Sequence, residues 1–269
     1  MSVLTARLKR LETTHEIMRF ATLLIEARNE VAEKVNLSRL VMPGFAEKVA
    51  SSIQKGNRPL LDEEVLECID YGVFSELLAE VFVKLLEKGS IDGEVERILE
   101  NLKANPAYGR QLLESALGIV ESVTPTVETE VLTHIVLTPL QPLLKTINQK
   151  NSRTQTPTYV RSCLTCGRNY ILGIYRGGFR HMLCSACGHV ARVDFFYCPT
   201  CGNTDPNSLR FKKPVEEPYF QIELCDRCGA YYKMVNEDIL GTVADDPLLI
   251  DFATIDLDNI ANSLRSKPP

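Results

Sequence analysis

The chain has 269 residues, of which 45% are hydrophobic and 24% are charged. This composition is typical of a globular protein large enough for two domains, and it excludes disordered and collagen-like classes. The formal net charge of -5 and a pI near 5.5 argue against a general affinity for nucleic-acid backbones and favour a protein partner. The first ten residues lack the apolar core of a secretory signal, and no apolar run is long enough to span a membrane, so we expect a cytoplasmic protein.

The first part of the chain, residues 1–150, predicts a helical bundle because its apolar residues recur at helical spacing. The helices that we expect are a long first helix over 4–35 and shorter helices over 44–55, 73–86, 92–104, 109–123 and 127–147. Pro139 and Pro142 must kink or divide the last of these. Asp62 and Asp92 lie where helix N-caps are expected.

A polar stretch over 151–158 separates this bundle from the rest of the chain and indicates a linker. The expected domains are the bundle over 1–150, the linker, a first four-cysteine ribbon over 159–195, a second over 196–236 and an acidic amphipathic tail over 237–269. The predicted fold class is therefore multi-domain α plus small β: an N-terminal helical bundle, two tandem rubredoxin-like or zinc-ribbon units and a C-terminal helical tail.

Eight of the nine cysteines form four Cys-x-x-Cys pairs in the second part of the chain. The pairs are Cys163 and Cys166, Cys184 and Cys187, Cys198 and Cys201, and Cys225 and Cys228. Each pair is followed by glycine, which permits the positive φ angle that such a turn needs. In a reducing compartment this density of thiols indicates metal ligation and not disulfides, and a dithiol redox couple would need only one pair. The ninth cysteine, Cys68, is expected to be a small buried hydrophobic residue.

An internal repeat indicates which pairs share an ion. The segments 179–184 and 220–225 align at an offset of 41 residues. We therefore expect two tandem ribbons with one tetrahedral site each. The first site comprises Cys163, Cys166, Cys184 and Cys187, and the second comprises Cys198, Cys201, Cys225 and Cys228. An interleaved pairing is the alternative, and the ligand set leaves open whether the metal is zinc or rubredoxin-type iron.

Two closed four-thiolate sites leave no open coordination position for catalysis at a metal. The sequence also lacks a phosphate loop, a dinucleotide-binding glycine motif and an HExxH motif, so we expect no enzyme activity, no catalytic residue and no organic cofactor. Ten basic residues and several aromatic residues over 157–233 suit a nucleic-acid-binding ribbon, but aromatic residues beside such turns more often fill the small core. Seven acidic residues over 234–258 indicate either a packed helix with a solvated face or a contact surface for a basic partner.

At the four cysteine pairs, the chain resembles the formate dehydrogenase accessory protein family, FdhE. The likeness covers residues 160–258 and lies in Cys163-Leu-Thr-Cys166-Gly167, Arg180-His-Met-Leu-Cys184-Ser-Ala-Cys187, Cys198-Pro-Thr-Cys201, Cys225-Asp-Arg-Cys228-Gly229 and Val243-Ala244-Asp245-Asp246. The resemblance implies a cytoplasmic protein that binds the catalytic subunit of a molybdenum- or tungsten-dependent formate dehydrogenase and is needed for its assembly or activation. It also implies iron held by the eight paired cysteines.

One stretch departs from the family pattern: Ala191 and Phe195 occupy the region where family members often carry tryptophan and arginine, which points to a different client surface. The alternative functions are a redox-active iron protein that acts on its client and a zinc-ribbon nucleic-acid-binding protein. The oligomeric state and the identity of the client subunit are left open.

Overall fold

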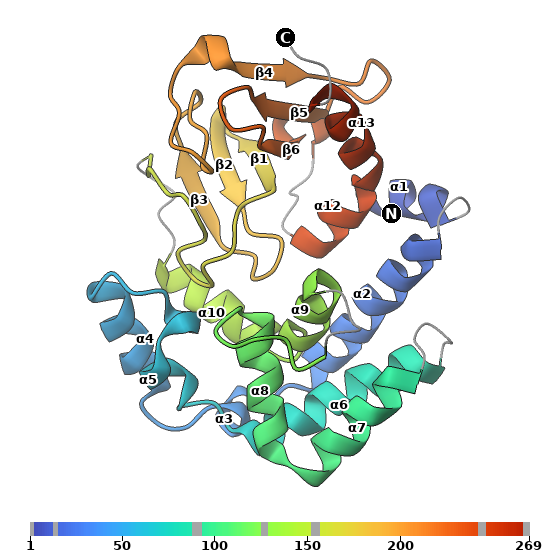
Figure 1. Ribbon diagram of the computed structural model, residues 1–269, viewed down its shortest axis with the longest axis vertical. Helices are drawn as coiled ribbons and strands as arrows, with labels where there is room; N and C mark the ends of the chain where they lie inside the picture. The colour runs from blue at the N-terminus through green and yellow to red at the C-terminus, as the bar shows by residue number, and fades with distance from the viewer. Residues whose placement is uncertain are drawn as a thin grey trace. The chain divides into compact units, whose positions relative to one another are not determined.

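The computed structural model describes residues 3–12, 16–87, 93–124, 129–151, 157–241 and 246–265. The chain divides into two compact units. The helical unit comprises Glu12–Lys150 and the short segment Thr165–Gly167, and the sheet unit comprises Met1–Leu11, Asn151–Leu164 and Arg168–Pro269. Figure 1 shows the helices of the first in blue to green, and the strands of the second in yellow to orange followed by helices in red. A helical N-terminal region, a small sheet region and final helices confirm the predicted fold class.

The helical unit is built around one long apolar helix. Its helices are α2 (Glu16–Lys34), α3 (Leu37–Leu40), α4 (Phe45–Gln54), α5 (Glu63–Leu66), α6 (Tyr71–Glu87), α7 (Gly93–Ala104), α8 (Pro106–Ala116), α9 (Thr129–Leu137) and α10 (Gln141–Asn151), with a 3-10 turn, η1, at Pro59–Leu61. Helix α6 packs against α2, α7, α8 and α9 through buried residues that include Phe74, Leu78 and Phe82. These residues recur at helical spacing, so α6 presents one continuous apolar face. Among the described residues, no helix combines the length and the hydropathy needed to cross a membrane.

Local capping determines several helix ends. Asp62 caps α5, where its carboxylate accepts a hydrogen bond from the Glu64 N–H at 3.2 Å, as its position predicted. Asp92 lies outside the described residues. The helix expected over 109–123 is α8, which begins earlier because Asn105 caps it and Pro106 fills its first position. It ends earlier because Gly118 adopts a φ of 73°, which stops helix propagation.

Two further sequence predictions concern helix continuity. The segment expected over 127–147 is divided into α9 and α10, and the break around Pro139 confirms the predicted division. The long first helix expected over 4–35 is found as α1 (Val3–Glu12) and α2, and the residues between them lie outside the described ranges. Because Met1–Leu11 belongs to the sheet unit, this part of the division differs from the bundle boundary of 1–150 expected from the sequence.

The sheet unit contains one six-stranded sheet with the order β3-β2-β1-β6-β5-β4. Its strands are β1 (Leu172–Arg176), β2 (Phe179–Leu183), β3 (Val190–Val193), β4 (Leu209–Lys212), β5 (Phe220–Cys225) and β6 (Tyr231–Asn236), and a 3-10 turn, η2 (Pro206–Ser208), precedes β4. Strands β1 to β3 form the first ribbon and β4 to β6 the second, each antiparallel. Parallel pairing of β1 with β6, which we call the seam, joins the ribbons into one sheet. The expected ribbons therefore exist but share a sheet.

Strand β1 requires glycine at position 173, next to the seam. Gly173 in β1 lies beside Met234 in β6. A Cβ atom at this position would lie 2.5 Å from the Met234 Sδ and 2.8 Å from the carbonyl oxygen of His181. The methionine side chain can move, whereas the strand backbone at His181 is held by the pairing of β1 with β2. Only glycine therefore permits this close approach of β1 and β2 within the first ribbon, and across the seam the missing side chain leaves room for Met234.

Helices at both ends of the chain cover one face of the sheet. α12 (Pro247–Ala253) packs against β1, and α13 (Ile255–Arg265) packs against β5 and β6, as Figure 1 shows. From this face the buried Lys233 extends its ammonium group to Asp251 at 2.5 Å and Asp258 at 2.9 Å. Burial alone would lower the pKa of Lys233, but the two carboxylates raise it, so the lysine is held charged. On the same face, the guanidinium of Arg7 in α1 lies over the Phe220 ring, 4.7 Å from its centroid.

The acidic residues near the C-terminus have partners inside the sheet unit. Asp245 lies outside the described residues. The other six pair as follows: Glu237 with Arg176, Asp238 with the backbone N–H groups of Gly177 and Gly178, Asp246 with the N–H of Leu249 at the start of α12, Asp251 and Asp258 with Lys233, and Asp256 with Arg7. These contacts support the packed-helix interpretation of the tail over that of a surface for a basic partner, because the charges are already neutralised or hydrogen-bonded.

The other face of the sheet carries a buried polar cluster. Arg180 in β2 and Glu223 in β5 form an ion pair across the intervening strands, with an Nη2–Oε2 distance of 2.7 Å and side-chain exposures of 2% and 5%. Glu223 also accepts hydrogen bonds from the Tyr175 hydroxyl and from Gln221. The Arg180 Nη1 donates to the carbonyl oxygen of Tyr197 at 2.9 Å, which fixes the segment between the two ribbons over this face.

Candidate metal centres

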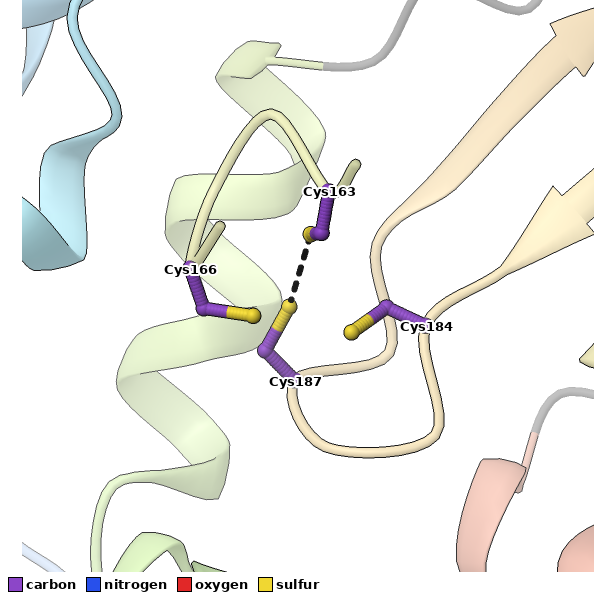
Figure 2. Close-up of side chains that lie close together, drawn as sticks. All are labelled: Cys163, Cys166, Cys184 and Cys187. Carbon is purple, nitrogen blue, oxygen red and sulfur yellow. Dashed lines mark hydrogen bonds between the residues drawn. The ribbon is translucent and has the colours of Figure 1, made fainter. Parts of the chain in front are cut away.

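The first candidate centre lies where two Cys-x-x-Cys turns meet. The sulfur atoms of its residues lie within 4.8 Å of one another, and all four side chains are buried: Cys163, Cys166, Cys184 and Cys187. Figure 2 shows the four side chains pointing toward a common point, with the Cys163 and Cys187 sulfurs 3.4 Å apart. The Cys184 turn is closed by hydrogen bonds from its N–H to the His189 carbonyl and from the Gly188 N–H to the Cys184 carbonyl.

The second candidate centre repeats this arrangement within the second ribbon. The sulfurs of its four cysteines also lie within 4.8 Å of one another: Cys198, Cys201, Cys225 and Cys228. Two of the sulfur pairs, Cys198 with Cys228 and Cys201 with Cys225, are each 3.7 Å apart. In the turn at Cys198, the N–H of Gly202 donates to the Cys198 carbonyl at 2.8 Å. Gly202 has a φ of 75°, which is the conformation that the sequence analysis assigned to the glycine after each pair.

The spacing of the sulfurs fits a tetrahedral ion. A metal–sulfur bond of about 2.3 Å places the ligands of a tetrahedral site about 3.8 Å apart. Three sulfur–sulfur separations, 3.4 Å in the first group and 3.7 Å twice in the second, are near this value. Partial desolvation of the sulfur atoms raises the pKa of the Cys225 and Cys228 thiols, and the neighbouring Cys198 sulfur raises both further. Four adjacent thiolates would therefore need a compensating cation, which a divalent or trivalent metal could supply.

The two centres differ in their exposure to solvent. All four cysteines of the first are buried, whereas in the second Cys201 is half-buried and Cys228 is exposed. The second centre also has a buried hydrogen-bonding neighbour, because the Tyr232 hydroxyl lies 3.1 Å from the Cys198 sulfur and accepts a hydrogen bond from the Thr200 N–H. Burial alone would raise the pKa of the Cys198 thiol, but the Tyr232 hydroxyl and backbone donors lower it. The second centre therefore combines a polarised sulfur with a solvent-accessible edge.

The structure brings the eight cysteines together in the two groups that the repeat predicted, and it does not interleave the pairs. That these groups bind metal stays a prediction. None of the nine cysteines forms a disulfide, and Cys68 lies outside both groups. The prediction that Cys68 is buried was wrong: its side chain is half-buried, and its thiol contacts the Glu64 carbonyl oxygen at 3.4 Å, because it lies just beyond the end of α5.

Sequence reasoning missed several neighbours of the centres. His189, which is not part of either four-cysteine group, is fully buried between the Tyr170 hydroxyl at 3.3 Å and the Asn151 carbonyl at 3.2 Å. Tyr232 is one of the aromatic residues over 157–233, for which the sequence predicted only a core-filling role. Tyr232 lies four residues after Cys228, and the sequence gives no signal for its contact because its partner, Cys198, lies more than thirty residues earlier.

Some of the features that suited a nucleic-acid-binding ribbon are used inside the fold. Four of the ten basic residues over 157–233 form ion pairs within the sheet unit: Arg176, Arg180, Arg210 and Lys233. Tyr170, Tyr175, Phe220 and Tyr232 are buried in its core. These contacts support the core-filling interpretation for the buried rings.

Comparison with known proteins gives a consistent result. No family model matches the chain. The chain is 22% identical over 254 residues to the protein named Protein FdhE homolog from Aquifex aeolicus (strain VF5), an alignment that covers 91% of this chain and 83% of that protein. The structure of this chain superposes on the crystal structure of the FdhE protein from Pseudomonas aeruginosa with a TM-score of 0.71 and 18% identity. The superposition covers 99% of this chain and 93% of the other. The resemblance that the cysteine pairs carry is confirmed in sequence and in fold.

Proposed function

From this similarity to FdhE proteins, we propose that the chain is a cytoplasmic accessory protein that binds the catalytic subunit of a formate dehydrogenase and is needed for its assembly or activation. The observation that carries the proposal is the pair of closed four-cysteine groups in one sheet, in a chain that resembles FdhE proteins over 91% of its length. The chain itself is not an enzyme in this proposal, since four thiolates fill the coordination sphere of each ion.

Each ion would be held by one group of four cysteines: Cys163, Cys166, Cys184 and Cys187 in the first, and Cys198, Cys201, Cys225 and Cys228 in the second. Family resemblance favours iron, and the same ligand set suits zinc. A bound ion supplies folding free energy to each ribbon, and iron would also supply one-electron chemistry. The protein's own part is to orient the sulfurs through the four turns and to hold both ribbons in one sheet through the seam, so that the client meets a single surface.

The proposal is tested by affinity purification of the tagged full chain from its own host under anaerobic conditions. We expect mass spectrometry to identify a formate dehydrogenase catalytic subunit among the co-purified proteins. Deleting the gene should abolish formate dehydrogenase activity, and the wild-type chain should restore it while Cys198→Ser should not. Exposed Lys103 lies in the helical unit, so Lys103→Gln is the matched control and should restore activity fully. Unchanged formate dehydrogenase activity in the deletion strain, or recovery of nucleic acid with no oxidoreductase subunit, would contradict the proposal.

A second candidate function is electron transfer to the client through iron at the second centre. The exposed Cys228 favours it, because electron exchange with a partner needs a ligand that reaches the protein surface. Rubredoxin-type iron has visible charge-transfer bands, whereas zinc is colourless. A colourless, zinc-filled chain that still supports formate dehydrogenase maturation would exclude this candidate and leave the accessory role intact.

A further inference from the structure

The tandem repeat places equivalent strands in different surroundings. In each ribbon the first strand pairs antiparallel with the strand that leads to the second cysteine turn: β1 with β2, and β4 with β5. The other side of β1 is occupied by β6, which adds to it in parallel at the seam. The corresponding side of β4 is the edge of the sheet, and within the described part of the chain no strand pairs with it. The fold thus contains an internal example of a strand docked on β1 and an open equivalent position on β4.

The free edge of β4 is positively charged. Its sequence is Leu-Arg-Phe-Lys and is followed by a second lysine, and Lys212 and Lys213 are exposed. Arg210 is neutralised by Asp226, with a closest N–O distance of 2.6 Å. Lysines on an edge strand prevent indiscriminate pairing with other strands, since like charges and desolvation oppose it. A segment with acidic side chains would convert this barrier into an attraction.

An exposed aromatic cluster adjoins the same edge. Phe211 of β4 packs against Phe195 and Phe196, with ring centroids 6.0 and 6.3 Å apart. Phe195 and Phe196 are 47% and 44% exposed, which is unusual for large aromatic side chains. Phe195 also contacts the buried ring of Tyr175, at 5.5 Å between centroids. Arg180 holds the surrounding segment through the carbonyls of Asp194 and Tyr197, so the cluster is anchored to the sheet.

We propose that the outer edge of β4 binds an extended acidic segment of a partner protein, which pairs with Leu209–Lys212 as a seventh strand and places an apolar side chain against Phe195, Phe196 and Phe211. Main-chain hydrogen bonds to the edge supply affinity, and the lysines and the aromatic cluster supply selectivity. Along β4, Phe211 lies between Arg210 and Lys212, and successive side chains of a strand point to opposite faces of the sheet. The aromatic ring and the charged side chains therefore lie on opposite faces. The inference rests on the sheet edge and not on the metals or on formate dehydrogenase, so it goes beyond the proposed function and can fail independently of it.

The test uses the full chain and a fluorescein-labelled ten-residue peptide of alternating glutamate and valine with one central phenylalanine. Fluorescence anisotropy should detect binding, and the same peptide with lysine in place of glutamate should bind at least about tenfold more weakly. Lys212→Glu/Lys213→Glu should weaken binding of the acidic peptide about tenfold or more. The matched control is Lys103→Glu/Lys145→Glu, which makes the same charge change at exposed positions of the helical unit and should leave the affinity unchanged.

Strand pairing has its own measurement. Hydrogen–deuterium exchange of the protein's backbone amides at Leu209–Lys212 should slow when the acidic peptide is bound. Methylating alternate backbone amides of the acidic peptide should abolish its binding and the slowed exchange. Binding without slowed exchange in β4, or equal binding of the acidic and basic peptides, would overturn the proposal. A third result would also overturn the proposal: slowed exchange in β4 without the peptide that grows with protein concentration and is lost in Lys212→Glu/Lys213→Glu. In that case the occupant of the edge would be a second copy of this chain.

Discussion

Replacing Glu223 by leucine should lower the free energy of unfolding of the sheet unit by about 3–5 kcal/mol. The reason is that Arg180 would remain buried without its counter-charge, since the two side chains are 2% and 5% exposed. The Tyr175 hydroxyl and the Gln221 amide would also lose an acceptor. Replacing both members of the pair by leucine should cost less, about 1–3 kcal/mol, because the charge is gone and only hydrogen-bonding groups such as the Tyr197 carbonyl lose partners.

The measurement is urea unfolding of the metal-loaded chain followed by near-ultraviolet circular dichroism. The chain has nine tyrosines and no tryptophan, and all tyrosines except Tyr71 and Tyr108 belong to the sheet unit, so this signal reports mainly on that unit. Asp226→Leu is the matched control: it breaks the more exposed pair with Arg210, whose side chains are 29% and 23% exposed, and should cost no more than about 1 kcal/mol. A loss below about 1 kcal/mol for Glu223→Leu, or a double variant no more stable than the single one, would refute the reasoning.

Three more predictions follow from the centres and from the docking of α1. Iodoacetamide should modify the exposed Cys228 before any thiol of the first centre, as peptide mass mapping would show; equal rates would argue against the difference in exposure. The Cys187→Ser variant should bind one ion where the wild type binds two, and its near-ultraviolet circular dichroism should weaken while the helical far-ultraviolet signal persists. Loss of both signals would show that the two units unfold together. Arg7 lowers the pKa of Glu217 in the folded protein below its usual 4.5 despite partial burial. The ion pair therefore stabilises the folded state fully above pH 4.5, and this stabilisation is lost as the pH falls through the pKa of Glu217 in the folded protein. Urea unfolding between about pH 6 and pH 3 should therefore show a smaller loss of stability for Glu217→Gln than for wild type, and parallel curves would contradict this.

The candidate centres were predictable because their determinants are local. A Cys-x-x-Cys turn followed by glycine closes on itself, and the repeat of Phe179–Cys184 in Phe220–Cys225 identifies matching strands in two ribbons. Pairing within each ribbon joins strands that are neighbours in the chain. The grouping of the sulfurs therefore follows from short-range information. The same is true of the Asp62 cap and of the break at Pro139.

The contacts that unify the sheet could not be predicted in this way. The seam pairs Leu172 with Lys233, and the buried pair joins Arg180 to Glu223 across two intervening strands. Arg7 contacts Glu217 and Asp256, so the first helix belongs with the sheet although the chain runs directly from it into the helical unit. Charged residues in an amphipathic pattern resemble surface residues, because a sequence shows the charge of a side chain and not the distant partner that neutralises it.

The glycine at the seam offers a way to perturb the two ribbons unequally. An alanine at position 173 would meet the carbonyl oxygen of His181 inside the first ribbon and only the flexible Met234 side chain across the seam. The first three-stranded leaf would therefore take up the strain, while the second would keep its own strands and sulfurs. A client that grips the first leaf would lose affinity for such a chain, whereas a client that touches only the second would not.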